Sequence, residues 1–190
     1  MKKSNILIVI LILLNCPAIY ADDFRQKVAE RKPVKIETNI IDPDEHIYGI
    51  PWGTSEDDFI DKMGNPTGYI QLSSLETGMI YGKRHMFFFK GNRLSGVRIS
   101  DIIWDYSIIS KMSGGSKLDN IKWQLVNGIE KGAANLKTLE KILGQKIGSA
   151  FPEVNYRTEN ARVTLRLSNI TSLRTTEQDH KVTGVMIEIN

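Results

Sequence analysis

The sequence contains two similar halves, and this internal repeat limits the possible folds more than any other feature does. The segment GIPWG at 49–53 aligns with GIEKG at 128–132, and each is followed by a short run with apolar residues at helical spacing. Both runs end at a glycine, Gly64 in the first half and Gly144 in the second, which is typical of a helix C-terminus. Each half is therefore expected to begin with a short helix.

The segments after these helices also recur, and they have the composition of β-strands. RHMFFF at 84–89 aligns with RVTLRL at 162–167, and LSGVRI at 94–99 aligns with VTGVMI at 182–187. Aromatic and branched residues are frequent in these segments, and a Gly-Asn pair after the first of them supplies a tight turn. We therefore predict an α+β fold of two tandem repeats, each with a short helical segment packed on an antiparallel sheet.

The repeat divides the chain into five parts. The middle is the hardest to assign, because residues 118–126 fit either a strand or a helix. The sequence Ser-Gly-Gly-Ser at 113–116 is typical of a flexible connection and marks the border between the halves. The predicted parts are a signal peptide at 1–21, an N-terminal segment at 22–46, a first helix-plus-hairpin repeat at 47–112, a linker at 113–117 and a second repeat at 118–190.

The first part has the layout of a secretory signal peptide. Lys2 and Lys3 precede an unbroken apolar run from Ile6 to Leu14, and mostly small or aliphatic residues follow up to Ala21. A membrane anchor is the alternative, but this run is well short of the ~20 apolar residues that a spanning helix needs. We expect cleavage after Ala21, a periplasmic location, and a mature chain that begins at Asp22 and has no stable membrane span.

Cys16 is the only cysteine, and it lies within the predicted signal peptide. The mature chain would then form no internal disulfide and would depend on its apolar core. Lipidation of Cys16 is the alternative, although Leu14 and Asn15 are poor matches to the small residues that this processing prefers. Loss of residues 1–21 removes two lysines and no acid, so the formal net charge falls from +3 to +1 and does not indicate nucleic acid as a partner.

The stretch SEDDFID at 55–61 contains four carboxylates at the start of the first predicted helix. A metal or acid/base site would need these groups to converge, whereas a helix N-terminus needs only negative charge near its unpaired N–H groups. The second half has Leu-Lys-Thr at 136–138 in the positions of the first three acids, so those acids are not part of the repeat. We interpret them as helix-start residues, with Thr54 or Ser55 as the first cap and Asn135 as the second.

Other candidates for chemistry are weak. Asp-Pro-Asp-Glu-His at 42–46 is the better metal candidate by residue type, and a metal role there is the alternative to a solvated turn. His85 and His180 are the remaining histidines, and no nucleophile motif lies near either of them. The Ser-Gly-Gly-Ser stretch lacks the lysine of a phosphate-binding loop. We therefore predict no enzyme activity, no catalytic residues, no metal and no cofactor.

Alternation along the predicted strands separates a core face from an open face. The core face, expected beneath the helices, carries Phe87, Phe89, Val97, Ile99, Val163, Leu165, Leu167, Val185, Ile187 and Ile189. The open face carries the candidate protein-binding residues Met86, Phe88, Arg98, Thr164, Arg166, Met186 and Glu188. Aromatic, methionine and arginine side chains are enriched in protein interfaces. The alternative is that residues 22–41, or the segment around Trp104, cover this face as ordinary core.

Residues 47–100 combine Gly-Thr-Ser with acids, an apolar helix, Met-Gly-Asn-Pro, a Phe-Phe-Phe strand, a Gly-Asn turn and Leu-Ser-Gly-Val-Arg-Ile. This order resembles the repeat of the β-lactamase-inhibitor-protein-like superfamily, which includes SmpA/OmlA-like lipoproteins of outer-membrane barrel assembly, and residues 126–189 resemble it more weakly. The resemblance implies helices packed on one face of an antiparallel sheet, with the other face or its loops free to bind proteins, and it does not imply catalysis. The chain departs from these relatives in its lack of mature disulfides and of a good lipidation site, so no particular partner carries over.

These features together predict an exported, non-enzymatic protein-binding module whose partner is another protein of the cell envelope. An inhibitor or immunity-like protein that acts on an envelope enzyme is the more specific hypothesis, and it follows from the resemblance. A structural component of envelope or outer-membrane assembly is the alternative, and lipidation of Cys16 would favour it. A small-ligand carrier is a further alternative if the two halves close on an apolar pocket.

Overall fold

The α+β class is confirmed by a computed structural model of the chain, which describes residues 33–100, 116–132, 134–147, 153–168 and 181–190. Residues Val34–Asn190 form one unit. Several predictions lie outside the described residues: the signal peptide, Cys16, the segment around Trp104, His180 and most of the linker at 113–117.

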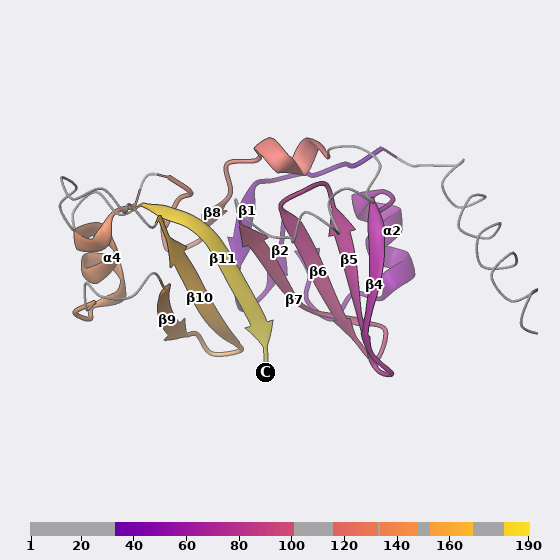
Figure 1. The fold of residues 1–190 in the computed structure, drawn as a ribbon. Coiled ribbons are helices and arrows are strands. Elements are labelled where there is room, and N and C mark those ends of the chain that lie inside the picture. Colours follow the sequence, from indigo (N-terminus) through magenta and orange to yellow (C-terminus); the bar gives the residue numbers. More distant parts are fainter. Residues whose placement is uncertain (1–32, 101–115, 133, 148–152, 169–180) are drawn as a thin grey trace, which may run out of the picture. The chain divides into compact units, whose positions relative to one another are not determined.

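The described residues form two sheets, two α-helices and a short 3₁₀-helix (Figure 1). The helices are α2 (Glu56–Met63), α4 (Leu136–Leu143) and the 3₁₀-helix η1 (Lys117–Asn120). The large antiparallel sheet has the spatial order β4 (Gly68–Ser73), β5 (Glu76–Tyr81), β6 (His85–Lys90), β7 (Arg93–Ser100), β11 (Val182–Ile189), β10 (Ala161–Leu167) and β9 (Glu153–Arg157). The small sheet has the order β3 (Ile50–Pro51), β2 (His46–Ile47), β1 (Ile40–Asp42) and β8 (Gln124–Leu125).

Strands from both halves of the sequence join in the large sheet, because β7 pairs with β11 (Figure 1). Two glycines permit this close pairing. A Cβ on Gly96 would meet the carbonyl oxygen of Ile187 at 2.6 Å, and a Cβ on Gly184 would meet the carbonyl oxygen of Ile99 at 2.6 Å. The helices of the two halves therefore pack on one shared sheet.

The predicted core face is buried beneath the helices and the small sheet. Nine of its ten residues are buried and Ile189 packs against them as a partly buried side chain. On α2, Phe59 lies among Tyr81, Phe87 and Phe89, with ring centroids 6.0, 4.8 and 5.3 Å away. These edge-to-face and tilted contacts fix α2 against β5 and β6.

The small sheet belongs to the same core as the helices, because Ile41, Ile47 and Leu125 are part of the same buried cluster. Strand β1 pairs in parallel with β8 and antiparallel with β2, which links the end of the N-terminal segment to the second half. The described end of the predicted N-terminal segment thus lies on the core side of the large sheet and does not cover the open face. The predicted boundary between residues 46 and 47 falls inside β2.

Both predicted helices have the predicted caps. The Ser55 hydroxyl accepts the Asp58 N–H at 3.2 Å, and the Asn135 side-chain oxygen accepts the Thr138 N–H at 3.0 Å. Both helices end at glycines with positive φ. The ambiguous middle contains both kinds of element, since η1 and the short strand β8 both fall between residues 117 and 125.

Residues that the sequence repeat aligns also make equivalent hydrogen bonds before each helix. The Gly53 N–H donates to the carbonyl oxygen of Leu94 at 2.9 Å. In the second half, the Gly132 N–H donates to the carbonyl oxygen of Val182 at 2.8 Å. Each glycine has a positive φ, 78° at Gly53 and 77° at Gly132. The segment before each helix is therefore hydrogen-bonded to the large sheet in the same way.

A second pair of equivalent contacts lies between the strands. The Ser95 hydroxyl donates to the Phe88 carbonyl oxygen at 3.2 Å, beside a register shift between Phe88 and the next residue. The Thr183 hydroxyl donates to the Arg166 carbonyl oxygen at 3.3 Å, beside a register shift between Arg166 and the next residue. Both hairpins thus carry the same irregularity at aligned positions.

Candidate protein-binding face

The seven candidate residues lie together on the side of the large sheet opposite the core face, and we call this surface the open sheet face. One row across β6, β7, β11 and β10 consists of consecutive cross-strand partners: Met86, Arg98, Met186 and Thr164. Phe88 and Glu188 lie in the next row, on either side of Gly96. Arg166 lies two residues along β10 from Thr164 and points to the same side.

Six of the seven candidate side chains are at least partly exposed, and Met86 is the exception. Only 3% of Met86 is exposed, and its sulfur lies over Gly78 of β5, where an added Cβ would approach it to 3.2 Å. Met86 therefore packs against its own sheet and is not available for contact with a partner.

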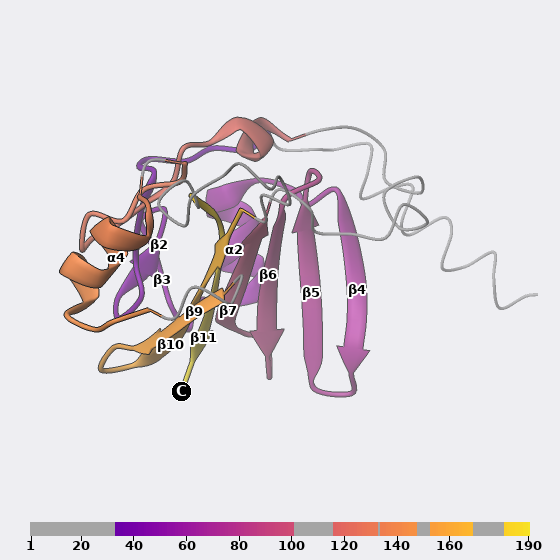
Figure 2. The same cartoon turned by 60° about the vertical axis from the view of Figure 1, so that its left-hand side comes forward.

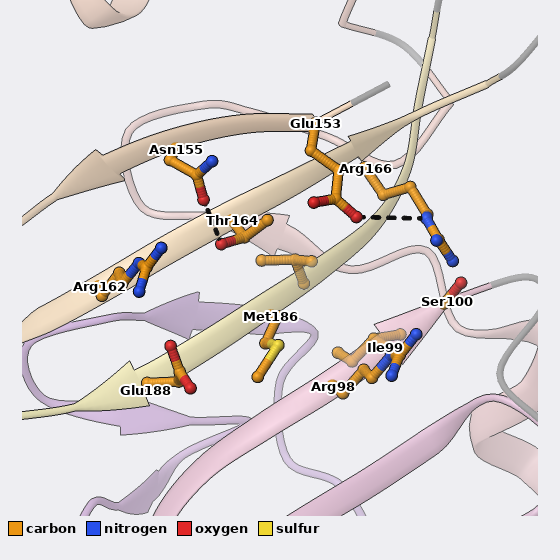
Figure 3. A pocket seen from close by; sticks show the side chains of 11 residues that line it. Arg98, Ile99, Ser100, Glu153, Asn155, Arg162, Thr164, Arg166, Met186 and Glu188 are labelled. Carbon is orange, nitrogen blue, oxygen red and sulfur yellow. Dashed lines mark hydrogen bonds and ion pairs between the residues drawn. The ribbon is translucent and has the colours of Figure 1, made fainter. Parts of the chain in front are cut away.

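A hollow of about 340 Å³ opens on the open sheet face between β7 and β9 (Figure 3). Five of the candidate residues line it: Arg98, Thr164, Arg166, Met186 and Glu188. Figure 3 shows Met186 near the middle, with Arg162 and Glu188 toward one end and Arg166 and Glu153 toward the other. The hollow thus places the apolar side chain of Met186 among charged side chains of both signs.

Sequence reasoning missed several polar residues that line the hollow: Ser100, Glu153, Asn155 and Arg162. Arg162 could have been found, because it lies two residues before Thr164 and so shares its face. Glu153 and Asn155 belong to β9, which the repeat did not predict. The Thr164 hydroxyl donates to the Asn155 side-chain oxygen at 2.5 Å, which orients both groups at the edge of the hollow.

The arginines of the hollow differ in their partners. Arg166 Nε lies 3.7 Å from Glu153 Oε1, and both side chains are more than 40% exposed, so this ion pair contributes little to stability. Within the described part of the chain, Arg98 and Arg162 make no ion pair. Their guanidinium groups are therefore available to a carboxylate from outside.

A smaller hollow of about 210 Å³ adjoins the first and shares Met186 and Glu188 with it. It is lined by the half-buried ring of Phe88 together with Lys90 and Glu76. The two hollows together extend the candidate surface from β5 to β9.

His85 lies on the opposite side of the sheet and is only 1% exposed. Its Nε2 is 3.0 Å from the Tyr48 hydroxyl, and its Nδ1 has no partner among the described residues. Burial, with smaller effects from Lys131 and Arg84, lowers the pKa of His85 from 6.5 to about 3. Burial also raises the pKa of Tyr48. His85 is therefore a neutral core residue that connects the large sheet to the turn between β2 and β3.

The acidic stretch at 42–46 connects two turns. Asp44 Oδ1 accepts the Thr158 hydroxyl at 2.6 Å and the Asn160 N–H at 2.8 Å, which fixes the turn between β9 and β10. Asp42 Oδ1 accepts the Asp44 N–H at 2.9 Å. In the described ranges, no group of three His, Cys, Asp or Glu side chains is arranged to hold a metal ion.

The acids at the start of α2 have separate contacts. Glu56 Oε1 accepts the Thr77 hydroxyl at 2.5 Å, and Asp58 Oδ2 accepts the Ser55 hydroxyl at 2.7 Å. Their oxygens therefore serve different partners, one on β5 and one at the helix cap. This supports the interpretation of the stretch as a helix start.

Comparisons with protein-family models, curated proteins and solved structures found no match to the chain. The resemblance drawn from the sequence therefore stays a prediction. Among the described residues, no helix is long and apolar enough to cross a membrane.

Proposed function

We propose that this protein is an exported, non-enzymatic module that binds another protein of the cell envelope through its open sheet face. The composition of that face carries the proposal. Phe88, Met186 and three arginines are at least partly exposed on one side of a sheet whose other side is buried. An exposed face of an antiparallel sheet is ordinarily polar, whereas aromatic, methionine and arginine side chains are enriched at protein interfaces.

The arrangement favours a partner that presents carboxylates beside apolar side chains. Arg98 and Arg162 offer planar donors that suit a carboxylate, and Met186 lies between them on the floor of the hollow. Phe88 adds an apolar surface on the adjoining side. Glu153 and Glu188 would repel wrongly oriented acids, so the mixed charges would favour one orientation of the partner.

Within this class we infer an inhibitor or immunity-like protein that acts on an envelope enzyme in the periplasm. Such a protein acts by occlusion, because its aromatic and arginine side chains fill the cleft of the target and a surrounding rim excludes water. The sequence resemblance supports this choice. A structural role in envelope assembly is the alternative, and a lipid on Cys16 of the protein isolated from cells would favour it.

We also propose that the two halves are tandem repeats related by an approximate two-fold axis through the open sheet face. The equivalent hydrogen bonds and register shifts of the two hairpins support this. The pairing of β7 with β11 supports it further, since Arg98 lies opposite Met186 and these two residues are aligned by the repeat. On this proposal, the partner binds over the axis, where the halves meet.

A pull-down from the envelope fraction of the source cells tests the binding proposal. The processed protein serves as bait, and the retained proteins are identified by mass spectrometry. Phe88→Ala combined with Arg98→Ala should reduce the retained partner at least about tenfold, because both anchors are lost. The control combines Val126→Ala with Lys122→Ala, which removes one apolar and one basic side chain that are exposed elsewhere.

Equal retention by the Phe88/Arg98 variant and wild type would exclude the open sheet face as the contact surface. Failure of wild type to retain any envelope protein would contradict the proposed function itself. Both variants should show the circular dichroism spectrum and thermal midpoint of wild type, so that lost binding reports on the surface.

A further inference from the structure

Strand β4 is one edge of the large sheet, and it pairs regularly with β5 from Gly68 to Gln71 before a register shift between Gln71 and Ser73 near the hairpin turn (Figure 2). Its sequence GYIQLS contains no charged residue and no proline. Natural edge strands commonly carry charges, prolines or bulges that prevent pairing with another strand. The outer N–H and C=O groups of β4 have no neighbouring strand in the described part of the chain.

The other edge of the same sheet differs. Strand β9 carries the exposed charged residues Glu153 and Arg157 at its two ends. It therefore carries the charges that β4 lacks, although both strands end the same sheet. The contrast shows that only one edge has the composition of a pairing surface.

Exposed apolar side chains are concentrated on the hairpin formed by β4 and β5. Of the five large apolar residues that are most exposed in the described ranges, three belong to this hairpin: Tyr69, Leu72 and Leu75. Their exposed fractions are 48%, 45% and 70%. The Gln71 side chain donates to the Glu76 carbonyl oxygen at 3.2 Å, so it holds the hairpin turn together.

We propose that two copies of this chain associate by antiparallel pairing of their β4 strands about a two-fold axis normal to the sheet. Such an axis sets each β4 strand opposite the β4 strand of the other copy. A charged side chain in β4 would then lie close to the same charge of the other copy and would be repelled by it. The absence of charge removes this repulsion. The backbone groups of both edges become paired, and the apolar side chains of the two hairpins cover one another. The dimer has one extended sheet and two open faces.

The oligomeric state of the processed protein, purified from cells that express the full chain, tests this inference. Sedimentation velocity from about 1 to 500 μM should show a reversible monomer–dimer equilibrium. Leu72→Lys should weaken the dimer at least about tenfold, because like charges would meet across the axis and apolar contact is lost. Val126→Lys is the matched control, since Val126 is 54% exposed at a different site, and it should leave the equilibrium unchanged.

Hydrogen exchange gives a second, independent measurement. The amides of β4 should exchange more slowly as the protein concentration rises, and those of β9 should not change. A monomer at all concentrations would overturn the inference, and so would a dimer that Leu72→Lys leaves intact. Neither result would affect the proposed use of the open sheet face, because the two surfaces consist of different residues.

Discussion

At the scale of single residues, His85 shows how an apparent candidate for chemistry serves the fold. It occupies the core face beside Phe87, with ring centroids 6.2 Å apart, and its ring nitrogen meets the Tyr48 hydroxyl. A charged imidazole at this position would lose its hydration without gaining an acid as partner from the described residues. The protein therefore keeps His85 neutral over a wide pH range.

This burial predicts a specific dependence of stability on pH. The unfolded chain binds a proton on His85 below about pH 6.5, whereas the folded chain does so only near pH 3. The unfolded state thus binds more protons between these values, so His85 makes the free energy of unfolding fall as the pH falls, by up to ~1.4 kcal/mol per pH unit. Urea titrations at several pH values between about 7 and 4 should show that His85→Gln lacks this contribution.

The matched control for that titration is Tyr48→Phe, which removes the hydroxyl partner and keeps the buried imidazole. Its stability should be lower than that of wild type but should fall with pH in the same way. Identical pH dependence in wild type and His85→Gln would show that His85 is not a buried neutral group.

Two glycines allow the strands of the two halves to meet, and their replacement gives a second prediction. Gly96→Ala and Gly184→Ala should each lower the free energy of unfolding by about 1–3 kcal/mol, because each new Cβ would press on a backbone carbonyl. Gly78→Ala should cost less, since the nearest atom to its Cβ would be the sulfur of the flexible Met86 side chain at 3.2 Å, and Ile70 would lie at an ordinary contact distance of 3.6 Å. Chemical denaturation of the three variants measures the difference, and an equal cost at all three positions would contradict this account.

At the scale of elements, the helix starts could be predicted because their signals are local. A capping side chain, apolar residues at helical spacing and a terminal glycine lie within about three turns of chain. The pairing of β6 with β7 could also be predicted, because only Gly91-Asn92 separates them, and both residues have positive φ. Strand β9 was not predicted, since its polar residues outnumber Val154 and Tyr156 and no aligned segment marks it.

The side chains that cap the two helices should contribute measurably to stability. Ser55→Ala and Asn135→Ala should each destabilise the protein by ~1 kcal/mol, because each leaves a helix N–H without its side-chain acceptor. Asp57→Asn should change the stability by less than about 0.5 kcal/mol, as expected for an exposed acid that acts only through the helix dipole. A larger loss for Asp57→Asn than for Ser55→Ala in thermal unfolding would show that the acids do more than begin a helix.

At the scale of the whole molecule, the sequence predicted the two faces of the sheet but not its continuity. Alternation placed Arg98 and Thr164 on one face, because period two is a local property of each strand. The pairing of β7 with β11, and of β1 with β8, joins residues more than 80 positions apart, and no local pattern specifies such contacts. The burial of Met86 was missed for the same reason, because it depends on Gly78 of a strand that the repeat did not identify.

The central claim is that the open sheet face is the surface that binds an envelope protein, and site-specific photocrosslinking in living cells tests it most directly. A benzoylphenylalanine introduced in place of Phe88 should give one discrete covalent adduct with another envelope protein on irradiation. The same group in place of Val126, which is exposed at another site, should give none. The claim would be contradicted if position 88 gave no adduct with another protein, or if both positions gave the same products.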